Sequence, residues 1–553
     1  MTLHLLDKIG NWNPQLFREI KGRLNTGNMA IASAFSLSGQ LLLFMYYSAQ
    51  IPVTPPNWNH TDPIYYEFCH SYHSKCVTDA LGNLVINWPK WWGEIFIWLS
   101  IFSVLALLLA GTYMLVSDLY KEERRGTLNF IRLSPQSAKT IFMGKILGVP
   151  ILLYVAAILA VPLHLYAGLA AHIPLDGILC FYAAVAASCA LFYSAAMLFG
   201  LTTSWLGGLQ PALATIPVFV LLWISAILPF THTAWDLLTF LSPIALLKYL
   251  IFGVLPEYYH FPFVAVNLDN LQWFYWPVDT NIASGLALSL LVCGTGTYWM
   301  WQGWQRRFPN PSATVLSKRQ SYLLVICCQV IFLGFALQSD APENANLICL
   351  LILNLLMFLA LIAALTSDRQ SLYDWARYRQ QIVPSSQKLW RRYPLLDLIW
   401  SDKSPAVVAI AINLLISVII LTPWTLLEKF ETNGFWGVIL CMNLILIYAA
   451  IAQLFLFTKT RNQEIWAART VGGAILLPPV ILSMLLLTPE KAPFLWLSST
   501  FGIWFSPFLT ATSGNTILLS ILSQWTVLVL LNLKLRSQLR LAGQSASKAL
   551  LKA

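Results

Sequence analysis

Apolar residues are gathered into long runs along this chain, and shorter polar stretches separate them. A helix needs about 17–25 mainly apolar residues to cross a bilayer. Runs of that length lie at residues 28–48, 93–116, 146–168, 178–202, 210–230, 283–301, 321–338, 346–366, 406–427, 435–457, 470–488 and 514–533. The pattern therefore predicts an all-α polytopic membrane protein with about twelve transmembrane helices.

Composition agrees with this fold class and excludes a soluble protein. Of the 553 residues, 58% are hydrophobic and 10% are charged, whereas a soluble chain carries about 25% charged residues. The net charge of +10 is typical, in so apolar a chain, of loops that face an anionic leaflet. We therefore expect an integral multi-pass protein of the bacterial plasma membrane, with the lipid bilayer and no nucleic acid as its partner.

The distribution of Lys and Arg predicts the orientation. If the N-terminus is placed inside, only Lys75, Lys90, Lys248, Lys429 and Lys491 fall in outer segments, and all the other Lys and Arg residues fall in inner ones. Positive residues accumulate on the cytoplasmic side of membrane proteins. Both termini are therefore expected in the cytoplasm.

Ionisable residues are nearly absent from the predicted spans. Glu94 lies at the outer edge of the second run, and His164 lies near the outer end of the third. A buried histidine is more often a hydrogen-bonded packing residue than a proton relay. Because ion-coupled transporters usually carry ionisable groups inside the membrane, we expect transport by this chain to draw its energy from elsewhere.

The two halves of the chain resemble a degenerate tandem repeat. Leu115-Val-Ser-Asp118 ends the second run and Leu365-Thr-Ser-Asp368 ends the eighth, and a long basic loop follows each. Ser242-Pro243 and Ser506-Pro507 precede the last run of each half. The expected organisation is an amphipathic N-terminal helix at 1–27, a six-span domain at 28–303, a linker at 304–320, a second six-span domain at 321–533 and a basic tail at 534–553. Segments 231–282 and 489–513 are too interrupted to span, and re-entrant or interfacial helices are expected there.

The loop after the second run, residues 118–135, has an unusual pattern. A short amphipathic helix is predicted from Leu119 to Leu133, with a break at Gly126-Thr127 and a new turn at Ser134-Pro135. Glu122, Glu123, Arg124 and Arg125 precede the break. An ordinary positive loop needs neither the acidic pair nor the break.

This loop resembles the coupling-helix region of type-2 ABC export permeases. That family has an acidic-basic cluster, Gly-Thr, a hydrophobic turn, Ser-Pro and then Gly-Lys before the third span. The matching residues are Glu123, Arg125, Gly126, Thr127, Leu128, Ser134, Pro135, Gly144 and Lys145. Residues 13–24 resemble the family's connecting helix, and the outer helical segment before the sixth span fits as well.

The resemblance implies a permease subunit of an exporter, with no catalytic activity or cofactor of its own. No Gly-x-x-x-x-Gly-Lys-[Ser/Thr] motif for phosphate binding occurs in the sequence. ATP and Mg²⁺ would be bound by ABC ATPase subunits supplied as separate chains, in two copies. Residues Glu122 to Thr127 with Ser134 and Pro135 would couple to them, and Glu122 and Glu123 would face donors on the ATPase.

The second half departs from this pattern. Its loop carries Asp368, Arg369, Arg377 and Arg379 but has no Glu-Arg-Gly-Thr. It is a candidate second coupling loop of degenerate form, and the sequence leaves open whether it still binds an ATPase.

A second cluster lies in the first outer loop. Cys69 and Cys76, expected outside, can form a disulfide. A metal site that also uses His70 and His73 is the alternative, and unpaired cysteines are a third. No other metal site is expected.

Two other functions remain open. One is a secondary transporter of twelve spans, and the other is a membrane enzyme such as a lipid-linked glycosyltransferase. Vanadate-sensitive, ATP-dependent activity would distinguish an ABC transporter from both of these alternatives. The apolar spans tolerate a lipidic passenger but do not identify the substrate.

Overall fold

The described part of the chain is almost entirely helical. A computed structural model describes residues 8, 10–52, 68–72, 75–77, 79, 83–254, 268–339, 343–382, 394–427, 433–458, 463–504 and 512–543. Within these residues, strands are limited to two short hairpins, β1 (Ser71–Tyr72) with β2 (Lys75–Cys76) and β3 (Gln272–Trp273) with β4 (Trp276–Pro277).

Twelve described helices are long and apolar enough to cross a membrane, and each overlaps one of the twelve predicted runs, with ends that differ by several residues. The chain is therefore an all-α, multi-pass membrane protein. The first six are α3 (Thr26–Ser48), α4 (Trp88–Leu105) continuing through a π-helical turn η1 (Ala106–Ala110) into α5 (Gly111–Arg124), α8 (Ile151–Ala170), α9 (Leu175–Thr202), η2 (Ser204–Leu209) with α10 (Gln210–Ile227), and α13 (Ile282–Arg307). The other six are α14 (Lys318–Ala336), α15 (Glu343–Leu365), α18 (Ala406–Leu427), α19 (Asn433–Phe455), α20 (Gln463–Met484) and α24 (Gly514–Gly543).

The contacts divide the chain into two compact units. Unit 1 comprises residues 1–231, 237–271 and 277–308, and unit 2 comprises residues 232–236, 272–276 and 309–553. The boundary after Phe308 falls inside the predicted linker at 304–320. The first six long helices belong to unit 1 and the last six to unit 2.

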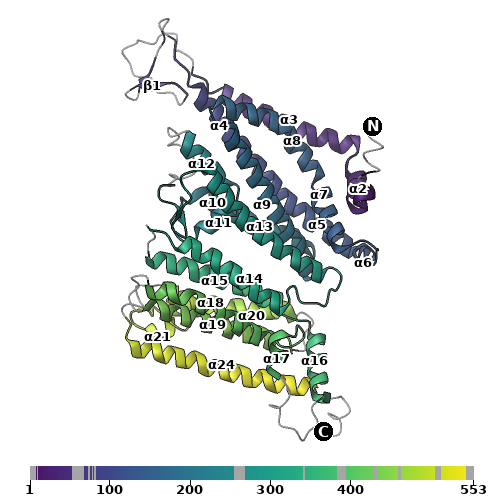
Figure 1. The fold of residues 1–553 in the computed structure, drawn as a ribbon, viewed down its shortest axis with the longest axis vertical. Coiled ribbons are helices and arrows are strands. Elements are labelled where there is room, and N and C mark those ends of the chain that lie inside the picture. The colour runs from purple at the N-terminus through teal and green to yellow at the C-terminus, as the bar shows by residue number, and fades with distance from the viewer. Residues whose placement is uncertain are drawn as a thin grey trace. The chain divides into compact units, whose positions relative to one another are not determined.

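In unit 1, α13 lies along α9, and α8 packs against both α3 and α4 (Figure 1). The N-terminal amphipathic segment forms α2 (Pro14–Arg23), which Asn13 caps by accepting a hydrogen bond from the Leu16 amide. Helix α2 crosses α7 (Ala138–Gly148) at two glycines. A Cβ at Gly144 would lie 2.8 Å from the Leu16 nitrogen, and one at Gly148 would lie 2.5 Å from Glu19 Cβ. Small residues thus let the two helix backbones approach closely.

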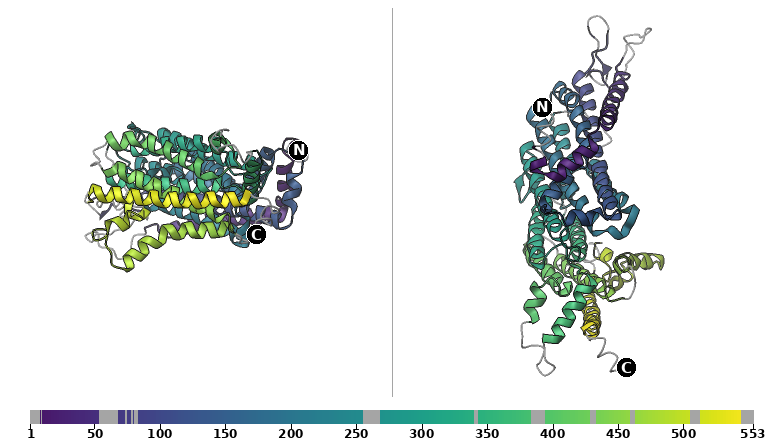
Figure 2. Two further views of the ribbon diagram at one scale, coloured as in Figure 1. Left: turned by 90° about the horizontal axis from the view of Figure 1, so that it is seen from below. Right: turned by 90° about the vertical axis from the view of Figure 1, so that its right-hand side faces the viewer.

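In unit 2, α19 packs against α15, α18, α20 and α24. Figure 2 shows the long C-terminal helix α24 running beside the other helices of this unit. Buried polar side chains join three helices near the centre, because Gln329 Nε2 of α14 donates to Asn354 Oδ1 of α15 and to Ser417 Oγ of α18.

The segments predicted not to span contain short helices. The first holds α11 (Asp236–Phe240), α12 (Ile244–Val254) and the β3–β4 hairpin, and the second holds α21 (Pro493–Trp496) and α22 (Thr500–Trp504). Lys248 of α12 is buried, and its ammonium group donates to the Leu228 carbonyl at 2.5 Å.

Candidate functional site

The helix that ends in the candidate coupling loop is unusually long. The run α4–η1–α5 extends without interruption over the 37 residues from Trp88 to Arg124, which is about 55 Å at the rise of an α-helix. Gly126 ends it with a φ of +73°, a conformation that glycine adopts without a steric penalty. Helix α6 (Thr127–Arg132) follows, and α7 begins after its cap Ser137. The predicted break at Gly126 is therefore confirmed. The segment from Leu119 to Arg124, predicted as part of a short separate helix, instead continues the span, and α7 begins after its cap Ser137, two residues after Pro135.

Hydrogen bonds fix the geometry of this break. The Thr127 hydroxyl donates to the Glu122 carbonyl at 3.1 Å, across the glycine. At the other end of α6, the Ser134 hydroxyl donates to the Ile131 carbonyl at 2.7 Å. Thr127 and Ser134 thus hold the two ends of α6, and Pro135 is exposed just beyond it.

Helix α6 has one buried and one exposed apolar side. Leu128 and Ile131 are buried in a cluster that includes Leu119, Phe142 and Trp304. In contrast, Phe130 is 79% exposed and Leu133 is 86% exposed. We call these two residues the exposed tip. Exposed apolar side chains that lie together mark contacts with a protein or with a membrane.

Behind the tip, six charged residues form a compact network that we call the charge cluster. The Lys145 ammonium, fully buried, lies 2.6 Å from Asp118 Oδ2, 2.8 Å from Glu122 Oε2 and 3.7 Å from Glu19 Oε1. Two arginines of α2 complete the network. Arg18 lies 2.6 Å from Glu122 and 3.3 Å from Glu19, and Arg23 lies 2.6 Å from Asp118 and 3.2 Å from Glu19.

The charge cluster is balanced, with three cationic and three anionic side chains. Burial by itself would lower the pKa of Lys145, but the carboxylates of Asp118, Glu122 and Glu19 outweigh it and hold that pKa above its ordinary value. Glu19, Asp118 and Glu122 are close enough together to hold a metal ion, but the Lys145 ammonium already supplies the positive charge among them. The cluster therefore joins α2, α5 and α7 electrostatically.

These contacts give Glu122 and Glu123, the two carboxylates predicted to couple to an ATPase, different surroundings. Glu122 was expected to face a partner protein, but its carboxylate binds Lys145 and Arg18 within the chain. Glu123, Arg124 and Arg125 are exposed beside the tip, in positions open to a partner. Sequence reasoning missed the cluster, although the spacing of Asp118 and Glu122 places both carboxylates on one helix face.

The second candidate loop folds differently. Residues Arg369–Ile382 form one unbroken helix, α16, whose Leu372 and Ala376 are buried near Phe457 and Leu535. Arg379 pairs with Asp397 of α17 (Pro394–Trp400) at 3.2 Å. The Arg369 guanidinium donates to the Tyr373 hydroxyl at 3.0 Å. A surface hollow on this helix is lined by Arg369, Gln370, Tyr373, Asp374 and Arg377.

Cys69 and Cys76 are joined by a disulfide that closes the β1–β2 hairpin. Their sulfur atoms are therefore not available as thiolate ligands for the alternative metal site. His70 is exposed on the same hairpin, whereas His73 lies outside the described residues. The hairpin precedes the start of α4, at the opposite end of the long helix from α6.

Both ionisable residues noted in the predicted spans are hydrogen-bonded. His164 lies between the Ser100 hydroxyl at 2.7 Å and the Tyr182 hydroxyl at 2.9 Å. Glu94 accepts a hydrogen bond from the Tyr47 hydroxyl at 3.2 Å. His164 is therefore a satisfied packing residue, as expected from the sequence.

Comparison of the chain with protein-family models, curated proteins and solved structures finds no match. The region with the most distinctive geometry is the exposed tip together with the charge cluster behind it.

Proposed function

We propose that this chain is the transmembrane permease subunit of an ATP-binding-cassette exporter, and that separate ATPase subunits dock on the exposed tip. The observation that carries the proposal is the orientation of α6. Leu128 and Ile131 anchor it, while Phe130 and Leu133 project outward. Aromatic side chains and arginines are enriched in protein–protein contacts, and Phe130 lies beside the exposed Arg124 and Arg125.

The connection between the tip and the spans supports a coupling role. Helix α5 continues directly into the span that begins at Trp88, and the charge cluster ties the same end to α2 and α7. Helix α2 leads into α3, and α7 leads into α8. A displacement of α6 would therefore move three spans together, because rigid packed elements transmit such movements.

The proposed mechanism uses ATP outside this chain. ATP and Mg²⁺ would bind the partner subunits, in two copies, and closure of those subunits would push on α6. The spans would then expose the substrate pathway alternately to the two sides of the membrane. This chain supplies the pathway and the docking surface, and it is not an enzyme by itself.

Two features support a cytoplasmic position for the tip. The segments around it are basic, which is typical of the cytoplasmic side. The disulfide hairpin lies at the opposite end of the long helix, and disulfides belong to oxidising compartments. We propose that both termini are cytoplasmic, that the membrane is the bacterial plasma membrane, and that each half of the chain is a six-span domain.

The test is purification of the full chain from its native host in mild detergent, followed by mass spectrometry. We expect a stoichiometric protein with a phosphate-binding loop to copurify. The double variant Phe130→Asp with Leu133→Asp should lose it. The matched control is Tyr378→Asp, which changes a residue of α16 that is 61% exposed and should retain the ATPase.

A result against the proposal is equally clear. If the wild-type chain is isolated without an ATPase, even after cross-linking, the docking role fails. If a complex with an ATPase is isolated but shows no vanadate-sensitive, ATP-dependent transport after reconstitution, the exporter role fails. If the double variant retains the ATPase, the tip is not the docking surface.

A further inference from the structure

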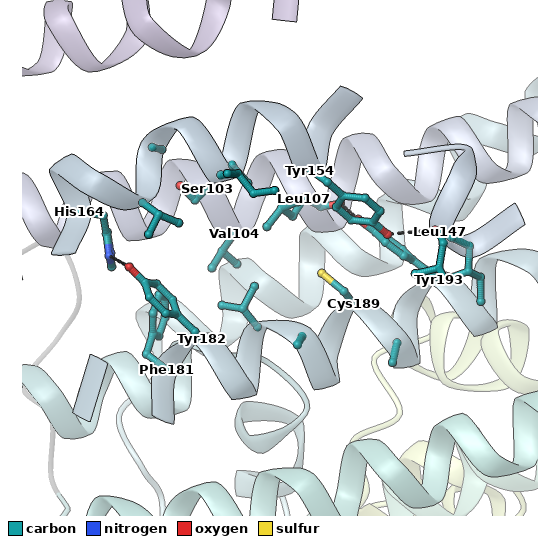
Figure 3. A pocket seen from close by; sticks show the side chains of 18 residues that line it. Ser103, Val104, Leu107, Leu147, Tyr154, His164, Phe181, Tyr182, Cys189 and Tyr193 are labelled. Atoms are coloured by element: carbon teal, nitrogen blue, oxygen red, sulfur yellow. Dashed lines mark hydrogen bonds between the residues drawn. The ribbon is translucent and has the colours of Figure 1, made fainter. Parts of the chain in front are cut away.

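An apolar cavity lies inside unit 1, lined by residues of α4, η1, α7, α8 and α9 (Figure 3). Its volume is about 560 Å³, which is within the usual range for sites that bind small molecules. Most of its wall is made of aliphatic side chains, such as Val104, Leu107, Val161 and Val185.

The polar groups in the wall are largely satisfied within the chain. The Tyr193 hydroxyl donates to the Leu107 carbonyl at 2.7 Å, and the Tyr154 hydroxyl donates to the Ile146 carbonyl at 2.9 Å. At the other end, the Tyr182 hydroxyl and the His164 ring are 2.9 Å apart (Figure 3). Apolar cavities of this kind do not hold water well and favour apolar contents.

One wall of the cavity reaches the surface of the spans. Ile158 and Val161 of α8 line the cavity, and they are 67% and 38% exposed. Ala186 of α9 also lines it and is exposed. An exposed apolar surface on a membrane-spanning helix meets the hydrocarbon of the bilayer. The cavity is therefore accessible from the side, through the membrane.

The length of the cavity fits one hydrocarbon chain. Tyr154 and His164 mark its two ends on α8, and their ten-residue separation corresponds to about 15 Å. This is roughly half of the hydrocarbon thickness of a bilayer, about 30 Å, and half the thickness is what the acyl chain of one leaflet occupies.

The cavity lies beside an irregular turn of the adjacent helix. Leu107 belongs to the π-helical turn η1, and its carbonyl accepts the Tyr193 hydrogen bond. Gly111 follows this turn, and a Cβ there would collide with the Tyr193 ring. Single π-helical turns within α-helices are frequent at functional sites, so η1 is a second, independent indication of binding.

We propose that this cavity is a lateral binding site for one acyl chain of a bilayer phospholipid. The acyl chain enters between Ile158 and Ala186 and lies along α8, between Tyr154 at one end of the cavity and Tyr182 at the other. This inference is independent of the ATPase proposal, because it uses only residues of the spans.

The test uses the full-length protein in lipid nanodiscs that contain a phosphatidylcholine with a diazirine in the middle of one acyl chain. After photolysis, labelled peptides are mapped by mass spectrometry. We expect label on the cavity-lining residues of α8 and α9. Ala186→Trp should lose this label because the indole fills the cavity. Leu179→Trp is the matched control on α9, since Leu179 is exposed outside the cavity, and it should keep the label.

A second cavity-filling variant, Ala157→Phe, takes the place of Ala186→Trp if that variant misfolds. Size-exclusion chromatography identifies which variants are intact. Equal labelling of the cavity in the wild type and in an intact filling variant would overturn the proposal. Labelling spread evenly over all lipid-facing residues would also overturn it. Cavity labelling by a diazirine free fatty acid, but not by the phospholipid, would reject a phospholipid as the occupant.

Discussion

The loops that follow the second span of each half begin alike and end in different structures. Asp118 and Asp368 occupy corresponding places after Val-Ser and Thr-Ser. In unit 1 the helix breaks at Gly126, and α6 presents Phe130 and Leu133 outward. In unit 2, α16 remains unbroken and buries Leu372 and Ala376, so that a hollow with two arginines faces outward. The glycine break lets α6 present an exposed apolar tip, which we propose as the docking surface.

Each unit also contains a buried lysine, and the groups that surround the two lysines differ. Lys145 lies among the carboxylates of Asp118, Glu122 and Glu19. The ammonium group of Lys318, at the start of α14, donates to neutral oxygens, the carbonyls of Leu398 and Pro405 and the hydroxyl of Ser404. The carboxylates of Asp402 and Asp397 also act on it electrostatically. Lys145 therefore joins three helices through charge, whereas Lys318 fastens its own helix to the segment around α17.

The largest effect is expected for Lys145→Met. Removing the ammonium leaves Asp118 with Arg23 and Glu122 with Arg18, so that three carboxylates share two cations. Loss of one partner in a buried ion network costs about 3–5 kcal/mol. Lys318→Met removes hydrogen bonds to neutral groups and should cost about 1–3 kcal/mol. Thermal unfolding of the two purified variants in one detergent compares them. Equal destabilisation would show that the charge cluster has no special role.

Glu122→Gln should reduce stability by less than Lys145→Met does, and comparison with Glu123→Gln distinguishes the buried-network carboxylate from the exposed one. Glu122 is held by Lys145 and Arg18, so its neutralisation should destabilise the protein by about 1–3 kcal/mol. Glu123→Gln changes an exposed side chain and should stay within about 0.5 kcal/mol of the wild type. The same melting assay measures both. A larger loss for Glu123→Gln would contradict the assigned positions.

Gly126→Ala is expected to lower the free energy of unfolding by about 1 kcal/mol, since an alanine at a φ of +73° is strained. The change should also turn α6 and weaken ATPase copurification. Gly22→Ala in α2 is the control, because nothing lies within 4 Å of a Cβ placed there. If both variants behave alike, the left-handed turn does not position the tip.

Much of this fold is predictable from sequence because hydropathy acts on whole runs of residues. The twelve spans follow from that signal, and the break at Gly126 follows from local glycine chemistry. The charge cluster does not, because it requires α2 to cross α7 at Gly144 and Gly148, a contact between segments far apart in the sequence. The cavity beside η1 is also unpredictable, since a π-helical turn departs from the regular helical period.

The smallest expected effect is the response to pH. Since the pKa of Lys145 is raised above its ordinary 10.5, its contribution is fully present below the unfolded pKa and is lost only as pH rises through the higher folded value. Melting temperatures of the wild type and Lys145→Met should therefore keep the same difference between about pH 7 and pH 9. A difference that disappears within this window would mean that Lys145 loses its proton there.

The most direct test of the central claim is photo-cross-linking from the tip itself. A benzoylphenylalanine replaces Phe130 in the full chain, and a second preparation carries it at Tyr378 on α16. We expect irradiation in native membranes to join position 130 to a protein with a phosphate-binding loop, with little adduct from position 378. No such adduct from position 130, or equal adducts from both positions, would contradict it.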